Sequence, residues 1–334
     1  MHTPPRRAAR VRFTVISLGR RGRRWWRSCV KYGAVIVSAL FYLHALTVAV
    51  GVWDQLRPQL FECGAPALSP AEYGDPERFS ATASPAELPW AAAPPESLTS
   101  LWQRLASDRL ISAFRITLPN PIWDEAHNVA LAARLLSGTV IAPGQTVSVI
   151  GLAGPFTKER GYGDGPGYAG GQLVPVTAGG VCKIGTAMYN VAVHGGLTVV
   201  ERHPHSMPVP YIRPGRDAAI AAGYKDVRVR NDYDRPVLLW AGMKETTLFV
   251  ALYGDVEAPT VHWRHEELDR VPAPLERRAN PALPPGQERI VFAGYDGVTV
   301  RTSITLERPG QPAETKLLSV DTYRPLRGVL EYGP

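Results

Sequence analysis

The chain has 334 residues, a length that predicts two compact domains or one domain with extra segments. Apolar residues make up 45% and charged residues 20%, which excludes an acidic solvating chain, a collagen and a coiled coil. The net charge of +7 would favour a nucleic-acid or membrane-surface partner if it were spread over the whole chain.

The excess of positive over negative charge comes from the first 31 residues. That tail contains ten Lys and Arg residues and no Asp or Glu. The rest of the chain holds 27 basic and 30 acidic residues, a net charge of −3. A mildly acidic body argues against a large nucleic-acid surface, so we expect no nucleic-acid partner.

Residues 32–53, from Tyr32 to Trp53, contain no charged side chain. About 20 apolar residues in a helix span a bilayer core, and Trp25, Trp26 and Trp53 flank the stretch as interfacial aromatics do. The basic tail then predicts a single-pass anchor in the cytoplasmic (inner) membrane, with the N-terminus inside and the body extracytoplasmic. A cleaved signal peptide is the alternative, but the span is long for one and no clear A-x-A site follows.

Composition divides the chain into five segments. These are a basic cytoplasmic tail at 1–31, a transmembrane helix at 32–53, a Pro/Ala-rich stalk at 54–110, a body at 111–256, and a linker with a small β module at 257–334. In the body, helical patterns at 124–136 and 184–193 precede strand patterns from 197 onward. The predicted fold class is α+β, with early helices packed on an antiparallel sheet and a small C-terminal β module.

Cys182 lies where a glycine-rich loop meets a predicted helix. The free N–H groups and dipole of a helix N-terminus favour a thiolate, and Lys183 would act in the same direction. Gly179 and Gly180 leave the backbone open to a substrate and would offer N–H donors to an oxyanion.

A second polar cluster, Glu201 to Ser206, follows about 20 residues later. His205 or His203 would serve as base for the thiol, with Asp217 or Asp226 orienting it. A cysteine at a helix start with a histidine on an adjoining sheet is the general layout of cysteine acyl-transfer enzymes.

Three other interpretations of the cysteine stay open from the residues alone. Cys182 would be an inert core residue, or it would form a disulfide with Cys63. A zinc site is the third, although its spacing matches no common motif. Its ligands would be Cys182, His194, His203 and His205.

Several motifs across residues 111–256 resemble the VanW domain family (vancomycin B-type resistance protein VanW-like). They are Glu125 to Ala132, Ile141 to Ser148, Gly161-Tyr162, Gly179 to Cys182, Thr186, Tyr189-Asn190, Glu201 to Ser206, Gly215 to Ala218, Asp226 and Asn231. The combination of GGVC, T, YN and ERHPHS is specific. The C-terminal β module is similar to the glycine-rich modules that accompany this domain and that are expected to bind cell wall.

The resemblance implies a membrane-anchored cell-envelope protein. Some members look like L,D-transpeptidases that cross-link peptidoglycan through a cysteine, which here would be Cys182 acting on peptidoglycan stem peptides. The candidate catalytic residues are Cys182, His205, His203 and Asp217, and the candidate substrate-binding residues are Gly179, Gly180, Lys183, Thr186, Tyr189, Asn190 and Arg202. No cofactor and no metal are expected.

Two positions depart from the family pattern, which usually has Gln and Ser where this chain has Lys183 and Gly185. A changed substrate or a lost activity would follow if the Gln binds the acyl donor. Two alternative functions therefore accompany the transpeptidase: a non-catalytic envelope binding or scaffold protein linked to glycopeptide resistance, and a cysteine peptidase or amidase of peptidoglycan.

Overall fold

A computed structural model describes residues 76–169 and 172–334. The basic tail, the apolar span at 32–53 and Cys63 therefore lie outside the described residues. All described residues belong to one compact unit.

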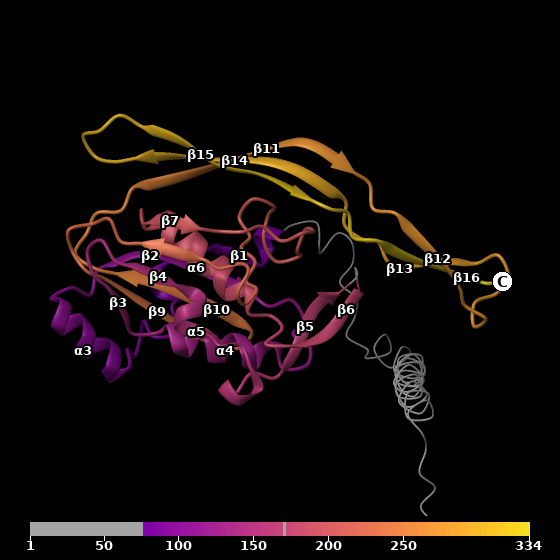
Figure 1. Cartoon of the computed structure of the whole chain (residues 1–334), viewed down its shortest axis with the longest axis horizontal. Helices are drawn as coiled ribbons and strands as arrows, with labels where there is room; N and C mark the ends of the chain where they lie inside the picture. Colours follow the sequence, from indigo (N-terminus) through magenta and orange to yellow (C-terminus); the bar gives the residue numbers. More distant parts are fainter. Residues whose placement is uncertain (1–75, 170–171) are drawn as a thin grey trace, which may run out of the picture. The chain divides into compact units, whose positions relative to one another are not determined.

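A five-stranded antiparallel sheet forms the centre of the body (Figure 1). Its order is β1 (Ser80–Thr82), β2 (Leu110–Thr117), β10 (Thr247–Tyr253), β9 (Val237–Lys244) and β3 (Thr139–Ile141). Strand β10 reads TLFVALY and is buried along nearly all its length. A strand that is apolar on both faces needs a covering layer on each side.

Helices cover one face of this sheet. They are α4 (Glu125–Leu136) and α6 (Cys182–His194), while the short helix α5 (Val149–Ala153) packs against both of them. Helix α6 is buried from Lys183 to Val193, because its residues are apolar or small almost all round. It packs against β2 and β10, which fixes its N-terminal residue Cys182 at the edge of the core.

Residues 76–105 cover the other face, although the sequence predicted a stalk there. This segment holds η1 (Pro76–Arg78), β1, η2 (Pro85–Glu87) and α3 (Glu96–Leu105). Leu88, Trp90 and Leu98 pack with Phe249 and other residues on the second face of β10. Before α3, the apolar side chains are spaced among prolines with no helical or strand period, so the sequence did not reveal that part of the layer.

Smaller elements carry the connecting loops. They are β4 (Thr146–Ser148), η3 (Lys158–Arg160), the hairpin β5 (Asp164–Ala169) and β6 (Gln172–Thr177), β7 (Thr198–Glu201) and β8 (Arg228–Arg230). Strand β8 pairs with both β4 and β7. The loop at 202–227 connects β7 to β8 and returns toward the start of α6.

The C-terminal module consists of two three-stranded sheets. The first has the order β11 (Thr260–Val271), β14 (Gly297–Glu307) and β15 (Glu314–Tyr323), and is antiparallel. The second has the order β12 (Leu275–Ala279), β16 (Gly328–Tyr332) and β13 (Glu288–Phe292), in which β12 and β16 are parallel. Strands β11 and β12 thus occupy residues 260–279, where the sequence predicted a linker.

The predicted fold class is corrected, because the described part is mostly β with four α-helices, α3 to α6. The excess of strand comes from residues 257–334, where paired strands replace the expected linker. Within residues 76–169 and 172–334, no helix is both long and apolar enough to cross a membrane. The span predicted at 32–53 lies outside the described residues, so the transmembrane helix and the single-pass membrane location lack support and are withdrawn.

Candidate functional site

Cys182 is the first residue of α6, directly after the turn that leaves hairpin β5–β6. Gly179 in that turn touches the backbone of the hairpin so closely that a Cβ there would lie 2.1 Å from the carbonyl carbon of Gly165. Gly180 has a φ of +97°. These two glycines allow the chain to turn tightly into the helix, where the N–H groups of Lys183 and Ile184 donate to the backbone O of Gly180 and of Val181 at 3.1 and 2.9 Å.

The Cys182 thiol is free and partly exposed. Its sulfur lies 3.4 Å from the backbone N of Ile220 and 3.6 Å from the backbone O of the same residue. The side chain of His205 is close enough to the sulfur to lower the pKa of the thiol. Gly185, one helical turn later, makes room for Ile220, since a Cβ there would lie 2.8 Å from the Ile220 side chain.

His205 lies between Cys182 and Asp217. Its Nδ1 is 2.6 Å from Asp217 Oδ2, and its backbone N–H donates to the same oxygen at 2.7 Å. The ring also meets Tyr211 edge to face, with centroids 6.4 Å apart. Because Nδ1 is taken by Asp217, Nε2 is the ring nitrogen that serves the thiol.

Asp217 is fully buried and held by several donors. Arg202 binds its Oδ1 at 2.8 Å and its backbone O at 2.7 Å. Tyr323, on strand β15, donates its hydroxyl to Oδ1 at 2.5 Å. A buried carboxylate with this many donors stays ionised and fixed in place.

The pKa shifts favour a thiolate beside an imidazolium. Burial opposes ionisation of the Cys182 thiol, but the hydrogen bond and charge of His205 outweigh it and lower the pKa of Cys182 below its usual range. Burial also opposes the charged ring of His205, but Asp217 and Cys182 raise its pKa to about 9. Burial of Asp217 is outweighed by His205 and Arg202, which lower its pKa to about 2.

The match to a protein family covers this site. The family described as "VanW like protein" matches residues 124–253, a range that contains Cys182, His205 and Asp217. This chain carries a VanW-like domain. The domain includes α4, α6, β9 and β10 but not Tyr323 or any other part of the C-terminal module.

Two curated proteins resemble the chain. "Uncharacterized protein YoaR" of Bacillus subtilis (strain 168) is 29% identical over 155 residues, which are 46% of this chain and 50% of that protein. "Vancomycin B-type resistance protein VanW" of Enterococcus faecalis (strain ATCC 700802 / V583) is 30% identical over 144 residues, 42% of this chain and 52% of that protein. The chain thus spans about half the length of the curated relatives it matches.

Two solved structures are similar over a shorter stretch. "Crystal structure of HP0197-G5" covers 23% of this chain and 100% of its own, with 25% identity and a TM-score of 0.14. "IgA1 Protease G5 domain structure" covers 24% of this chain and 98% of its own, with 22% identity and a TM-score of 0.15. TM-scores this low support no statement about fold.

Within the VanW-like domain, Lys183 is a buried residue of α6. Its Nζ lies 2.5 Å from Glu125 Oε1, and both side chains are almost fully buried. The same Nζ lies 4.5 Å above the ring of Tyr211. The lysine that replaces the family's usual Gln therefore forms an ion pair inside the domain, beside the thiol.

The other candidate binding residues of α6 bond to the protein itself. Thr186 accepts a hydrogen bond from the backbone N of Ala218 at 3.0 Å, and Asn190 donates to the backbone O of Arg216 at 2.8 Å. Tyr189 is buried, with Arg202 above its ring at 5.3 Å. In this structure these side chains, and Arg202 itself, shape the loop that carries Asp217.

The structure separates the two candidate histidines. His203 is partly exposed and its Nε2 lies 3.0 Å from Glu201 Oε1, while His205 reaches the thiol. The four residues of the zinc alternative are not brought together, because His194 bonds to Trp263 instead. Among residues 76–169 and 172–334, no group of three His, Cys, Asp or Glu side chains is arranged to hold a metal ion. Asp226, the other candidate orienting acid, accepts from the backbone N of Ile150.

Tyr323 and Asp321 are functional neighbours that the sequence did not indicate. They lie more than 100 residues beyond Asp217 and outside the matched family region. Their only local signal is strand alternation, since buried Asp321 and Tyr323 flank exposed Thr322. Such alternation shows which face is covered but not what covers it.

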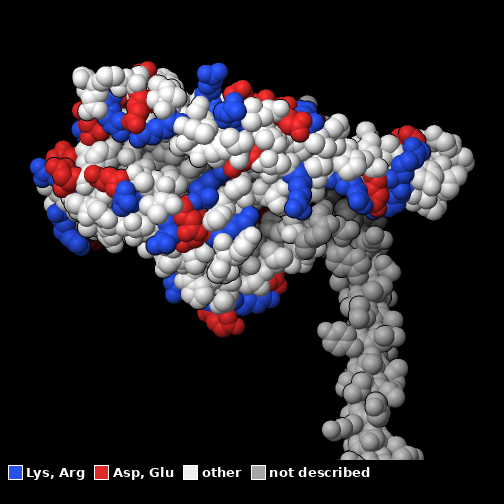
Figure 2. Space-filling model, turned by 45° about the horizontal axis from the view of Figure 1, so that its top comes forward, with Lys and Arg blue, Asp and Glu red and all other residues white. Residues whose placement is uncertain are grey.

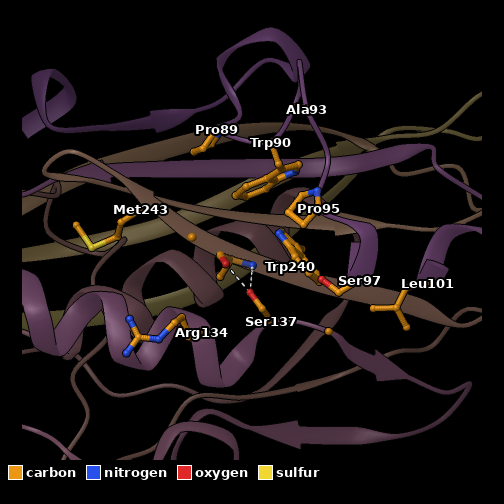
Figure 3. Close-up of a pocket in the computed structure, with 13 residues that line it drawn as sticks. Pro89, Trp90, Ala93, Pro95, Ser97, Leu101, Arg134, Ser137, Trp240 and Met243 are labelled. Carbon is orange, nitrogen blue, oxygen red and sulfur yellow. Dashed lines mark hydrogen bonds between the residues drawn. The ribbon is translucent and has the colours of Figure 1, made fainter. Parts of the chain in front are cut away.

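A pocket of about 590 Å³ lies elsewhere, between strand β9 of the VanW-like domain and the segment at 89–101, which includes part of helix α3 (Figure 3). It forms where β9 continues past its partner β3, which pairs only with residues 237–239. Ser137 Oγ accepts from the backbone N of Ala241 at 2.9 Å and so satisfies part of the open strand edge. None of its lining residues is Cys, His, Asp or Glu, so it offers no thiol and no carboxylate or imidazole base.

Proposed function

We propose that this chain is a cell-envelope protein that acts on peptidoglycan as a cysteine-dependent, L,D-transpeptidase-like acyl transferase. The observation that carries the proposal is the chain of contacts from Cys182 through His205 to Asp217 at the N-terminus of α6. The name of the VanW relative supports the association with the cell envelope, because it describes that protein as a vancomycin resistance protein.

In the first half-reaction the Cys182 thiolate attacks the carbonyl carbon of the donor peptide bond. An S–C bond forms, and the carbonyl oxygen becomes an oxyanion that the positive end of the α6 dipole would stabilise. The C–N bond then breaks as the imidazolium of His205 gives its proton to the departing amine of the terminal D-residue. The product is an acyl thioester on Cys182.

In the second half-reaction an amine from another stem peptide attacks the thioester. His205 takes a proton from that amine, a new amide bond forms, and the thiolate leaves. Asp217 stays ionised throughout and stabilises the charged ring. Water in place of the amine would give hydrolysis, the peptidase or amidase outcome.

The test is product analysis by mass spectrometry, with the purified full chain and muropeptides of defined structure. We expect wild type to form cross-linked dimers and release the terminal D-residue, and Cys182→Ala to form none. Cross-linking that persists in Cys182→Ala would contradict the proposal, and cleavage without dimers would replace transfer by hydrolysis. A wild-type chain with neither activity, and with a Cys182 that alkylates slowly at pH 6–7, would favour the scaffold alternative.

A paired test distinguishes the two histidines. His205→Ala should lose activity, since no other imidazole reaches the thiol in the described part of the chain. His203→Ala should retain most of it, because that ring faces Glu201. Equal losses in both variants would contradict the assignment of His205.

A further inference from the structure

The C-terminal module reaches the centre of the site through one strand. On β15, Asp321 and Tyr323 are buried while Thr322 between them is exposed, so both point toward the VanW-like domain. The Tyr323 hydroxyl donates to Asp217 Oδ1 at 2.5 Å and accepts from the backbone N of Gly215 at 2.8 Å. One phenol therefore ties the orienting carboxylate to the loop that bears it.

Arg202 connects the second module residue to the same carboxylate. One of its terminal nitrogens lies 2.8 Å from Asp217 Oδ1, and the other lies 2.5 Å from Asp321 Oδ2. The side chains of all three residues are at most 7% exposed, so water screens this charge network little. The positive charge of Arg202 is thus shared between Asp217 and Asp321, which is a carboxylate of the module.

The module also contacts the backbone of the loop at 202–227 in two places. The N–H of Arg324, next to Tyr323, donates to the backbone O of Ser206 at 2.8 Å, one residue beyond His205. At Gly215, where φ is +89°, a Cβ would lie 2.0 Å from Thr302 Oγ1 on β14. A glycine is required there because the module approaches the loop so closely.

We propose that Tyr323 and Asp321 are positioning residues of the Cys182–His205–Asp217 site, so that the C-terminal module completes a site that the VanW-like domain alone leaves unfinished. The inference rests on the proposed function, because it assigns the module a role in the same site. On this proposal the module orients Asp217 and His205, which is a role beyond the cell-wall binding expected of such modules.

The two residues should act on His205 with opposite signs. The groups that face the ring are Asp217, Cys182 and Tyr211. Tyr323→Phe removes a donor from Asp217, which leaves the carboxylate more basic and should raise the pKa of His205. Asp321→Asn frees the charge of Arg202 to act on Asp217 alone, which should lower the pKa of His205.

The experiment measures the titration of His205 by histidine-labelled NMR in the full-length chain, with His205→Ala to assign the signal. The alkylation rate of Cys182 is followed in parallel by mass spectrometry of its peptide. We expect shifts of about half a pH unit or more, upward in Tyr323→Phe and downward in Asp321→Asn. Thr322→Ala is the matched control on the exposed face of the same strand and should shift nothing.

A merely structural role would not give opposite shifts. If Tyr323→Phe unfolds cooperatively at the wild-type temperature and leaves the titration within about 0.2 units, the inference is wrong. Shifts of the His205 pKa in the same direction in both variants would also overturn the inference. If Asp321→Asn does not fold, the shift in Tyr323→Phe alone decides it. If the His205 titrations do not move but Cys182→Ala still loses cross-linking, this inference is wrong and the proposed function stands. If Cys182→Ala retains cross-linking, the proposed function is wrong, and the titrations still decide the inference.

Discussion

The C-terminal module contacts the VanW-like domain in two regions that differ in kind. One is the Tyr323 contact, in which Tyr323 and Asp321 join buried charges around Asp217. The other is the Trp263 contact, in which Trp263 lies 4.5 Å from the guanidinium of Arg216 and donates to His194 at 3.1 Å. Arg216 and Asp217 are adjacent, so the module holds one segment from two directions.

Protonation distinguishes the two contacts. Burial lowers the pKa of His194 and of His265 to about 4, so both rings are neutral in the Trp263 contact. His205, bonded to Asp217, has its pKa raised to about 9 and is charged. The Tyr323 contact therefore acts on the charge of the site, while the Trp263 contact stabilises it by packing.

Removing the carboxylate at the centre of the Tyr323 contact should have the largest effect. In Asp217→Asn the neutral amide no longer stabilises the imidazolium or fixes its tautomer, so we expect cross-linking to fall by about 10²–10⁴-fold. Steady-state rates on muropeptides measure this. Asp232→Asn, a partly exposed aspartate bonded to Arg230, is the control and should stay near wild type. An Asp217→Asn variant with near wild-type turnover would show that the charge of this contact is irrelevant to the chemistry.

The pH dependence of alkylation and cross-linking by the wild-type chain tests the charges of Cys182 and His205 at the same contact. The lowered pKa of Cys182 predicts that alkylation is already fast below the ordinary range of a thiol, about 8.5. Cross-linking should decline as pH rises through about 9, because His205 then loses the proton that it gives to the leaving amine. A rate that instead keeps rising from pH 8 to 10, as a free thiol would give, would contradict the ion pair.

Breaking the Trp263 contact should reduce stability and leave the titration of the site alone. Trp263 is half-buried, so truncation to Ala should lower the free energy of unfolding by roughly 2–3 kcal/mol. Denaturant unfolding of the full chain measures this, and Trp263→Phe, which keeps an aromatic face, should lose less. A shift in the His205 titration of the folded Trp263→Ala chain would erase the distinction between the two contacts.

Sequence patterns located Cys182, His205 and Asp217 because chemistry-bearing residues gather within one stretch at the end of a glycine-rich loop. They did not separate His205 from His203, because both belong to one polar segment and the two bonds of His205 to Asp217 depend on the fold. Strand β10 was recognisable as apolar, but the layer at 76–105 that covers its second face has a helical period only in α3. Asp321 and Tyr323 were not predictable, since the pairing of distant segments depends on tertiary structure.

The smallest effect is expected in the sheet β12-β16-β13 of the module, where Glu331 on β16 binds Arg278 and Arg289. Figure 2 shows basic and acidic side chains next to one another over this end of the module. The pKa of Glu331 is lowered to about 2, chiefly by Arg278, so its contribution to stability is present above about pH 4 and is lost as pH falls through about 2. Because the arginines are more than a third exposed, we expect Glu331→Gln to cost about 1 kcal/mol or less. Hydrogen exchange should show faster exchange in β12 and β16 only. The His205 titration should not move, and a shift there would mean that the whole module, rather than β15, controls the site.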